Sequence, residues 1–506
     1  MNNYIPNVSI GSVLPPILTP SILQSLNNNT LTIPGNSGDQ PDYKCQAYLE
    51  ALAKWLLPIY LMGGTLAMRS AKKTYLPQEA GESDDLYNNR LQRTVLFGAY
   101  SRTIQVLTSL PFVDPIQIKN APEALKYLNE KGHAAARLEQ VAKNLTTEAI
   151  HLGISFLFVE NPEIPEGASY AEEKKYKPYF ITISPLDLIN WKFDESGNLK
   201  MFTFYSYDTE DDGAFGETIV HKVTQVTPQG QQEFLKRDGS EEWVLGRSAS
   251  STFGKIPLIP VFGKRSGEMS GSPVLEELAW QNLRHYQKQS DLDNIEHACN
   301  VPFLFGAGID DEQADKMIIG PFAFISSSQP DAKLGFVEHN GTAIPSSQKS
   351  IDDIEKRMVQ MGADIITQTS VARQTAFAKA VDTGQSMSIL EAVVQDVSNA
   401  MEIGYTLIAE MLQETIPEDF EVIIGEGIEL SRSPEDAQFL KELAMEGFLR
   451  IEDFQFELSR RGKISDTTKL QKPKPKQDVS GQAGNEGDQN QGDKTAPSQN
   501  VDNTQE

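Results

Sequence analysis

Two short motifs in this sequence contain residue types that could do chemistry. Val381-Asp382-Thr383-Gly384 includes the Asp-Thr-Gly tripeptide of aspartic proteases, and Gly263-Lys264-Arg265-Ser266 includes the Gly-Lys pair of phosphate-binding loops. Aspartic proteases need two carboxylates that share one proton, but the tripeptide occurs once, in a predicted loop. The second motif lacks the earlier glycine of G-x-x-x-x-G-K-S/T. We therefore interpret the first motif as loop and the second as a turn that follows a strand.

Two further groups of residues have the side chains of metal ligands. His297 and Cys299 lie two positions apart near a predicted helix end, but a zinc site needs four ligands and no nearby residues complete the set. An acidic run lacks the glycine spacing of a calcium-binding loop and is interpreted as a solvated helix start. No metal and no cofactor is expected, and the chain is not expected to be an enzyme. The acidic run contains Asp310, Asp311, Glu312 and Asp315.

The elements that would position any site form a hairpin of long helices with a small β insert. The first helix is predicted to begin at Ser272-Pro273, since proline is favourable in the first turn of a helix. In the second helix, apolar residues recur at spacings of three and four, which makes a narrow stripe for packing against one neighbour. The predicted order is helix 272–298, β segment 301–339, helix 350–366, polar loop 367–388 and helix 389–414; the stripe is Ile351, Ile354, Met358, Met361 and Ile365.

Residues 41–270 predict an α+β domain. Helical patterning begins near Asp42 and continues in two blocks, about 83–110 and 138–152, the second ending at Gly153. Short runs rich in β-branched and aromatic residues then predict strands. These strands are expected over 154–160, 179–184, 188–193, 201–207, 218–227, 242–245 and 256–262, with a further short strand at 420–424.

The two ends of the chain have a different composition. Prolines and asparagines over residues 1–40 predict an extended arm. Two small helices are expected at about 434–445 and 451–460. Residues 471–506 contain no Leu, Ile, Met, Phe, Tyr or Trp, so this tail is predicted to be disordered because it cannot bury enough apolar surface to offset the loss of chain entropy.

Length and charge limit the classes of function. At 506 residues the chain predicts two to four subdomains. Its formal net charge of −25 argues against tight binding of nucleic acid through a basic face, although a protein can surround DNA without gripping it. Two distant cysteines argue against a disulfide framework and favour a reducing compartment. No signal peptide is evident, and prolines, glycines and charges interrupt the most apolar window, Tyr48–Met68, so no membrane span is expected.

The order of several short motifs resembles the portal proteins of tailed bacteriophages, over about residues 41–468. The resemblance lies in the succession of many weak motifs and not in a catalytic signature. The N-terminal helix is followed by a Tyr-Leu-Pro motif and an acid-rich turn. The motifs are Thr74-Tyr75-Leu76-Pro77, Gly81-Glu82-Ser83-Asp84, Pro178-Tyr179-Phe180, Ile189-Asn190-Trp191, Ile256-Pro257-Leu258-Ile259-Pro260, Ser272-Pro273-Val274-Leu275-Glu276-Glu277-Leu278 and Leu458-Ser459-Arg460-Arg461-Gly462.

This resemblance implies a portal-like α+β fold with a wing domain, long stem helices, a small β clip and a helical crown. The implied division begins with an N-terminal arm and ends with a disordered tail. Its parts are arm 1–40, wing 41–271, stem helix 272–300, clip 301–345, stem helix 346–366, tunnel loop 367–388, wing long helix and strand 389–430, crown 431–468 and tail 469–506.

The resemblance also implies a function and partners. The chain would form a ring, usually of twelve copies, at one vertex of the virion capsid, assembled in the host cytoplasm. Double-stranded DNA would pass through its channel during packaging and ejection. The implied partners are the terminase large subunit, a head-tail adaptor, and the major capsid and scaffold proteins, with no membrane. The implied channel residues are Arg373, Gln374 and Lys379, and the implied terminase- or adaptor-facing clip residues are Asp310, Asp311, Glu312, Lys316 and Lys333.

Two other functions stay open at this point. The chain could be a different structural part of the virion, such as an adaptor or minor head protein, or an enzyme whose site carries no known motif. Loop 367–388 could equally be a solvated connection between two helices, although a loop of this length inside a compact domain usually has a function or is disordered.

Overall fold

The computed structural model describes residues 18–27, 33, 35–129, 138–162, 169, 176–213, 215–240, 242–299, 303–307, 331, 333–337, 344–362 and 376–425. By internal contacts the chain divides into two units, residues 1–430 and 431–506, and every described residue belongs to the first. The predicted crown helices and the C-terminal tail therefore lie outside the described residues.

Short helices build the N-terminal part of the core. α2 is apolar on nearly every side, and Tyr48, Leu52 and Leu61 have no exposed surface. Trp55 is also buried and donates its indole N–H to the backbone oxygen of Gly271 over 3.1 Å. The helices are α2 (Gln46–Met62), α3 (Gly64–Ser70), η1 (Lys72–Thr74), α4 (Asp84–Arg93), α5 (Ala99–Ser109), η2 (Leu110–Phe112), η3 (Glu123–Asn129) and α6 (Leu138–Leu152).

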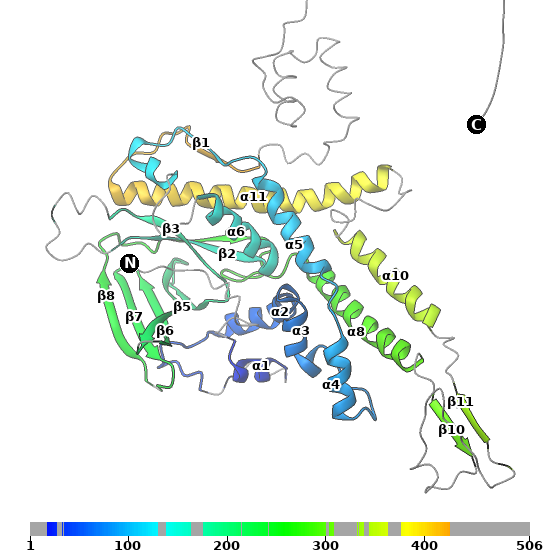
Figure 1. Cartoon of the computed structure of the whole chain (residues 1–506). Helices are drawn as coiled ribbons and strands as arrows, with labels where there is room; N and C mark the ends of the chain where they lie inside the picture. Colours follow the sequence, from blue (N-terminus) through cyan, green and yellow to red (C-terminus); the bar gives the residue numbers. More distant parts are fainter. Residues whose placement is uncertain are drawn as a thin grey trace, which may run out of the picture. The chain divides into compact units, whose positions relative to one another are not determined.

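Two antiparallel sheets follow, one central and one peripheral (Figure 1). The central sheet has the order β3-β2-β9, and β2 is buried along almost its whole length. The peripheral sheet is a meander in which β4 to β8 pair in sequence order. The strands are β2 (Ile154–Glu160), β3 (Tyr179–Ile183), β4 (Leu188–Phe193), β5 (Leu199–Asp212), β6 (Gly216–Thr227), β7 (Gly230–Arg237), β8 (Val244–Ser250) and β9 (Leu258–Phe262).

The long helix α11 (Ala376–Leu412) packs on the central sheet together with α6 (Figure 1). Gly404 permits this close approach, because a Cβ atom there would lie 2.7 Å from the Phe180 ring. Next to it, Tyr405 packs edge-on against Phe180 with ring centroids 5.4 Å apart. After α11, β12 (Glu421–Ile423) returns to pair with β1 (Gln117–Lys119).

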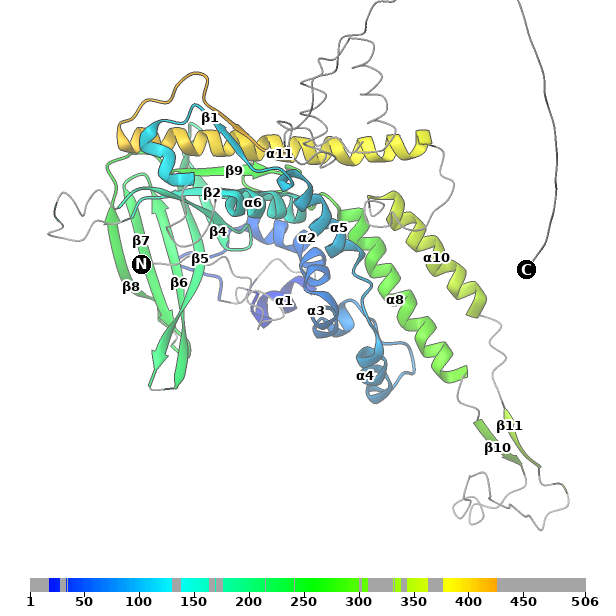
Figure 2. The same ribbon diagram turned by 45° about the horizontal axis from the view of Figure 1, so that its top comes forward.

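The remaining elements are a second pair of helices and a hairpin. α8 (Glu276–Cys299) and α10 (Ile344–Gln360) lie side by side (Figure 1 and Figure 2). Between them in the sequence, β10 (Phe303–Ala307) and β11 (Lys333–Val337) pair antiparallel, with Phe303 opposite Val337 and Ala307 opposite Lys333. The prediction of mixed α and β structure is confirmed, and the strands predicted at 154–160 and 188–193 are found at those residues.

The prediction of an extended arm over residues 1–40 is wrong for part of that range. Pro20–Asn27 form the helix α1, and Leu18, Ile22 and Leu26 are buried in the main core. Proline at the first helical position is compatible with a helix start, and apolar residues spaced four apart form a stripe. The interpretation treated Pro20 as a helix breaker, although at a helix N-terminus it favours the helix.

Several helix boundaries also differ from the prediction. The predicted helix 83–110 is two helices, α4 and α5, separated by the extended segment 94–98. The predicted helix start at Ser272-Pro273 is also wrong, because α8 begins at Glu276. α10 begins at Ile344 rather than Ser350, with Pro345 in its first turn, and Gly362 at φ +106° follows its end. α11 begins at Ala376, so residues 376–388 are helix and not loop. The alanines at 376, 378 and 380 favour helix.

Candidate assembly site: the helix pair, its root and its hairpin

The predicted apolar stripe of the second stem helix is the contact surface between α10 and α8. Ile351, Ile354 and Met358 are each at most 5% exposed, while Asp352, Asp353 and Lys356 on the other faces of α10 are exposed. At the same interface, His285 Nε2 lies 3.1 Å from the Glu355 carboxylate. α10 packs on α8 and has no other packing partner of comparable extent among the described elements.

On its other side α8 is part of the main core. Leu278, Leu283 and Tyr286 are buried there, and α8 packs against α2, α4 and α5. One helix of the pair is therefore fixed to the domain and carries the other. This arrangement is a two-helix projection with a core-facing side, rather than a pair enclosed on all sides (Figure 1 and Figure 2).

Three glycines join the start of α8 to the central sheet. Gly153 ends α6 with φ +86°, and its carbonyl accepts hydrogen bonds from the N–H groups of Gly263 and Lys264. A Cβ at Gly153 would lie 2.0 Å from the Ser272 carbonyl oxygen, and one at Gly271 would lie 2.3 Å from backbone atoms of Gly153. The backbones at these positions are therefore in direct contact, and side chains cannot fit between them. We call Gly153, Gly263 and Gly271 the glycine root of α8.

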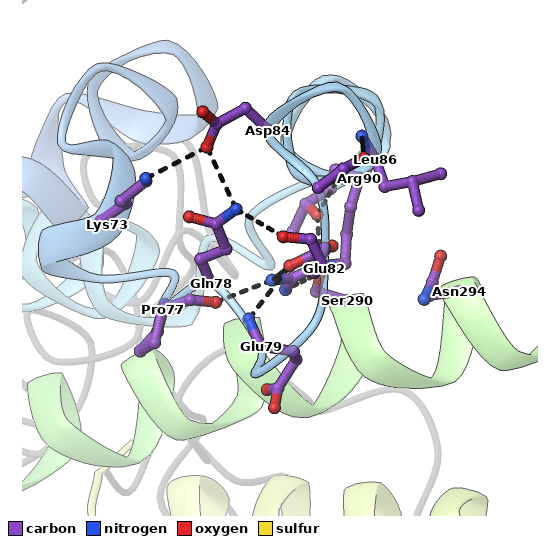
Figure 3. Close-up of polar contacts among 12 residues, drawn as sticks. Lys73, Pro77, Gln78, Glu79, Glu82, Asp84, Leu86, Arg90, Ser290 and Asn294 are labelled. Carbon is purple, nitrogen blue, oxygen red and sulfur yellow. Dashed lines mark hydrogen bonds and ion pairs between the residues drawn. The ribbon is translucent and has the colours of Figure 1, made fainter.

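A buried polar network joins α4 and the Tyr-Leu-Pro turn to the middle of α8 (Figure 3). The Arg90 guanidinium donates to both carboxylate oxygens of Glu82, over 2.9 and 2.8 Å, and to the Pro77 carbonyl over 2.7 Å. It also reaches the Ser290 hydroxyl of α8 at 3.4 Å, and that hydroxyl lies 2.8 Å from Thr94 Oγ1. The hydrogen bonds from Arg90 hold the pKa of Glu82 below its usual value, against the opposing effect of burial.

The hairpin of β10 and β11 follows α8 after three residues and precedes α10 by six. Among the described residues each of these strands pairs with the other alone, so each has one free backbone edge. Lys333 lies at the first position of β11, opposite Ala307, and is exposed. Free strand edges are available for pairing with another chain.

Only two of the predicted site residues, Lys333 and Lys379, lie among the residues that the structure describes. Lys333 lies on the hairpin, and Lys379 lies in the first turn of α11, which corrects its placement in a loop. Arg373 and Gln374 lie outside the described residues, as do Asp310, Asp311, Glu312 and Lys316. Glu82, Gly153 and Gly263 belong to motifs noted in the sequence, but the Arg90–Glu82 pair and the backbone contacts of the glycine root were not predicted. The only available signals for them were the Glu-Ser-Asp turn and three isolated glycines.

The charges of the helix pair are mixed, with an acidic excess. α8 carries five acidic residues against Arg284 and Lys288, and α10 carries three of each sign. The exposed stripe of α8 includes Glu277, Arg284, Lys288 and Asp291. A surface of this kind does not provide the dense positive charge that tight DNA binding needs.

Two ionisable side chains of α6, Glu148 and His151, have shifted pKa values. Burial raises the pKa of Glu148 to about 7, with the charge of Asp187 adding to the effect and a hydrogen bond from Ser184 opposing it. Burial also lowers the pKa of His151 to about 3, and its Nδ1 lies 3.2 Å from the Tyr100 hydroxyl. Within the part of the chain that the structure describes, no three His, Cys, Asp or Glu side chains could hold a metal ion, and no helix has the length and apolarity to cross a bilayer.

Comparisons with known proteins give one family match. A family model described as a domain of unknown function (DUF4055) matches residues 274–412. None of the curated proteins matches the chain. Among solved structures, the chain is similar to one titled "Neck of empty GTA particle computed with C6 symmetry", with 11% identity and a TM-score of 0.41, over 78% of this chain and 98% of that chain.

The bounds of the family match coincide with structural boundaries. The match begins at Val274, two residues before α8, and ends at Leu412, the last residue of α11. The family match therefore covers the helix pair, its hairpin and the long helix.

Proposed function

We propose that this chain is a portal protein of a tailed bacteriophage or related particle, a non-enzymatic ring at one capsid vertex through which double-stranded DNA enters and leaves. The observation that carries the proposal is the projecting pair of α8 and α10 with the hairpin between them. This geometry is expected when many copies place such pairs around a common axis. The succession of motifs from Thr74-Tyr75-Leu76-Pro77 to Leu458-Ser459-Arg460-Arg461-Gly462 supports it.

Each part has a proposed role in that ring. Residues 41–271 with 389–430 form the wing, α8 and α10 form the stem that encloses the channel, and the hairpin belongs to the clip at which the terminase and later the adaptor dock. The free edges of β10 and β11 suit pairing between neighbouring copies, which would remove an aggregation hazard. The major capsid and scaffold proteins would contact the wing.

The acidic excess of the chain suits passage of DNA and not its retention. A wall of net negative charge repels phosphate over about 8 Å at physiological salt. DNA would then move through the channel without adhering to it. The few cations of segment 367–388, Arg373 and Lys379, would make weak and screened contacts with the DNA.

The double variant Arg373→Ala with Lys379→Ala tests the proposed role of this segment. Rings are expected to form as in the parent protein, because neither residue belongs to the described core, while the amount of DNA packaged or retained per particle falls. The measurement combines ring images with the DNA content of purified particles. The matched control is Lys192→Ala with Lys200→Ala, two exposed cations of the peripheral sheet, which should change neither ring formation nor DNA content. If the Arg373 and Lys379 variant fails to assemble, the segment is structural and the proposed role is wrong.

The proposal as a whole is tested by the mass of the purified protein. Rings with a central hole and about twelve times the chain mass of 56.1 kDa are expected in negative-stain images and mass photometry. A protein that stays monomeric at every concentration would contradict the proposal.

A further inference from the structure

Three large apolar side chains form an exposed patch beside α8. Val95 and Phe97 are 57% and 50% exposed and alternate with the buried Thr94 and Leu96 along the extended segment 94–98. Because successive side chains of an extended segment point to opposite sides, Val95 and Phe97 share one side. Leu66 of α3, next to this segment, is 68% exposed. We call these three residues the Phe97 patch.

The backbone of this segment is fixed by polar side chains on both sides. Arg69 donates to the Thr94 carbonyl over 3.0 Å, and Thr65 Oγ1 accepts from the Leu96 N–H over 3.2 Å. From α8, the Asn282 amide donates to the Phe97 carbonyl over 2.8 Å. The Phe97 ring packs against His285 with centroids 5.1 Å apart. The patch is therefore held in an exposed position, and ordering it on contact would cost little entropy.

A groove of about 690 Å³ opens where α8, α10 and α11 meet. Its lining is mainly apolar, and two of the lining side chains remain half-exposed: Trp280 at 56% and Ile389 at 46%. Leu275 and Met361 contribute to its walls. Tryptophan at an exposed groove is characteristic of residues that contribute strongly to protein contacts. We call this feature the Trp280 groove.

The Trp280 side chain of the groove and the segment that carries Phe97 lie on opposite sides of α8 at nearly the same level. Asn282 binds the segment that carries Phe97, and Trp280 precedes Asn282 by two residues. Two residues correspond to about 200° around the helix axis and about 3 Å along it. A rotation about an axis parallel to α8 would therefore bring the patch of one copy to the level of the groove of the next.

The charges around the two features are complementary. The exposed Arg93 and Arg102 lie on either side of the segment that carries Val95 and Phe97. Glu276 and Glu277 line the groove, and Lys264 is the one cation among the described residues that line it. A contact between patch and groove would therefore place arginines near glutamates, which favours this orientation over contacts between like features.

We propose that the Phe97 patch of one copy of this chain occupies the Trp280 groove of the next copy. The contact is heterologous, since it joins two different surfaces. Such contacts close into a ring when repeating the rotation between copies returns to the first copy, and otherwise form an open filament. The inference rests on the proposed portal function and adds to it the surfaces through which the copies join.

Mixing two single variants tests this contact. Phe97→Asp removes the patch and Trp280→Asp removes the groove, and each places an unpaired carboxylate at the contact, so association should weaken at least about tenfold. Each variant alone is expected to stay monomeric at concentrations where the parent protein forms rings. Mixed in equal amounts they retain one intact patch and one intact groove, so a dimer of about twice 56.1 kDa is expected, with no larger species. Native mass spectrometry resolves these species.

The control is Val244→Asp on β8, a 63% exposed valine on the peripheral sheet, which should still form rings. Circular dichroism melting of each variant checks that it is folded, which is expected because both substituted side chains are exposed. Rings formed by either contact variant would overturn the inference. Monomeric variants that fail to dimerise on mixing would overturn it as well. Absence of rings in the parent protein itself would instead contradict the proposed function.

Discussion

Replacing Gly153 by alanine is expected to lower the free energy of unfolding by about 4 kcal/mol or more. Few structural causes produce so large a loss in a single substitution. Two of them act here. The left-handed conformation, φ +86°, costs a residue with a Cβ about 1–2 kcal/mol. The Cβ would also lie 2.0 Å from the Ser272 carbonyl oxygen, so the chain that leads into α8 must shift. Urea unfolding followed by circular dichroism gives the difference.

Gly197→Ala separates the two contributions. Gly197 has φ +82°, almost the same conformation, but an added Cβ would meet no atom within 4 Å. Its substitution should therefore cost only the conformational term, about 1–2 kcal/mol. Equal losses for the two variants would show that the close contact at the glycine root contributes nothing, and the account of how α8 is attached would be wrong.

Replacing Arg90 by alanine is expected to cost roughly 3–5 kcal/mol, because it leaves the Glu82 carboxylate buried without its partner. The two side chains are 4% and 10% exposed, so water compensates little of the loss. The network also ties the Tyr-Leu-Pro turn to Ser290 of α8, and assembly should weaken together with stability. Arg93→Ala, at an exposed arginine that donates to Asn294, is the control and should change the free energy of unfolding by about 0.5 kcal/mol or less.

The effect of Arg90→Ala should depend on pH. The pKa of Glu82 is lowered in the folded state, so the pair stabilises the protein above the ordinary pKa of glutamate, and this contribution disappears as pH falls through the lowered value. The difference between parent and variant in denaturant midpoint should therefore shrink in acid. A difference that stays constant down to pH 3 would show that Arg90 acts through packing and not through the ion pair.

The helices and strands that were predicted correctly are those whose own residues carry a hydrophobic or β-branched pattern. β2 contains an uninterrupted apolar run from Phe156 to Val159, and β4 is rich in aromatic and β-branched residues; both were located correctly. β7, by contrast, reads GQQEFLKR and carries no β-branched residue, so its strand depends on pairing with β6 and β8 and was missed. The break at 94–98 was missed for a related reason. Its extended backbone is fixed by Arg69 and Asn282, which lie far away in the sequence.

In the candidate site, too, the features with a local sequence pattern were predicted and those that depend on long-range contacts were not. The stripe of Ile351, Ile354 and Met358 predicted a helix with one packing neighbour, and α10 has that neighbour in α8. Arg90 pairs with Glu82 only eight positions away, but its network reaches Ser290, 200 positions away, and the glycine root joins residues more than 100 positions apart. No local spacing can reveal these long-range contacts, because their physical cause is the close approach of segments that only the folded chain brings together.

The central claim is that α8 and α10 line a channel that exists only when copies close into a ring. A three-dimensional reconstruction of the purified assembly by electron cryomicroscopy tests it most directly. If α8 and α10 line the channel, we expect a closed ring whose central hole is bordered by the α8 and α10 pairs of every copy, with the β10 and β11 hairpins at one end. A ring lined by the β4 to β8 sheet, an open filament, or a monomer with α10 enclosed in its own core would contradict it.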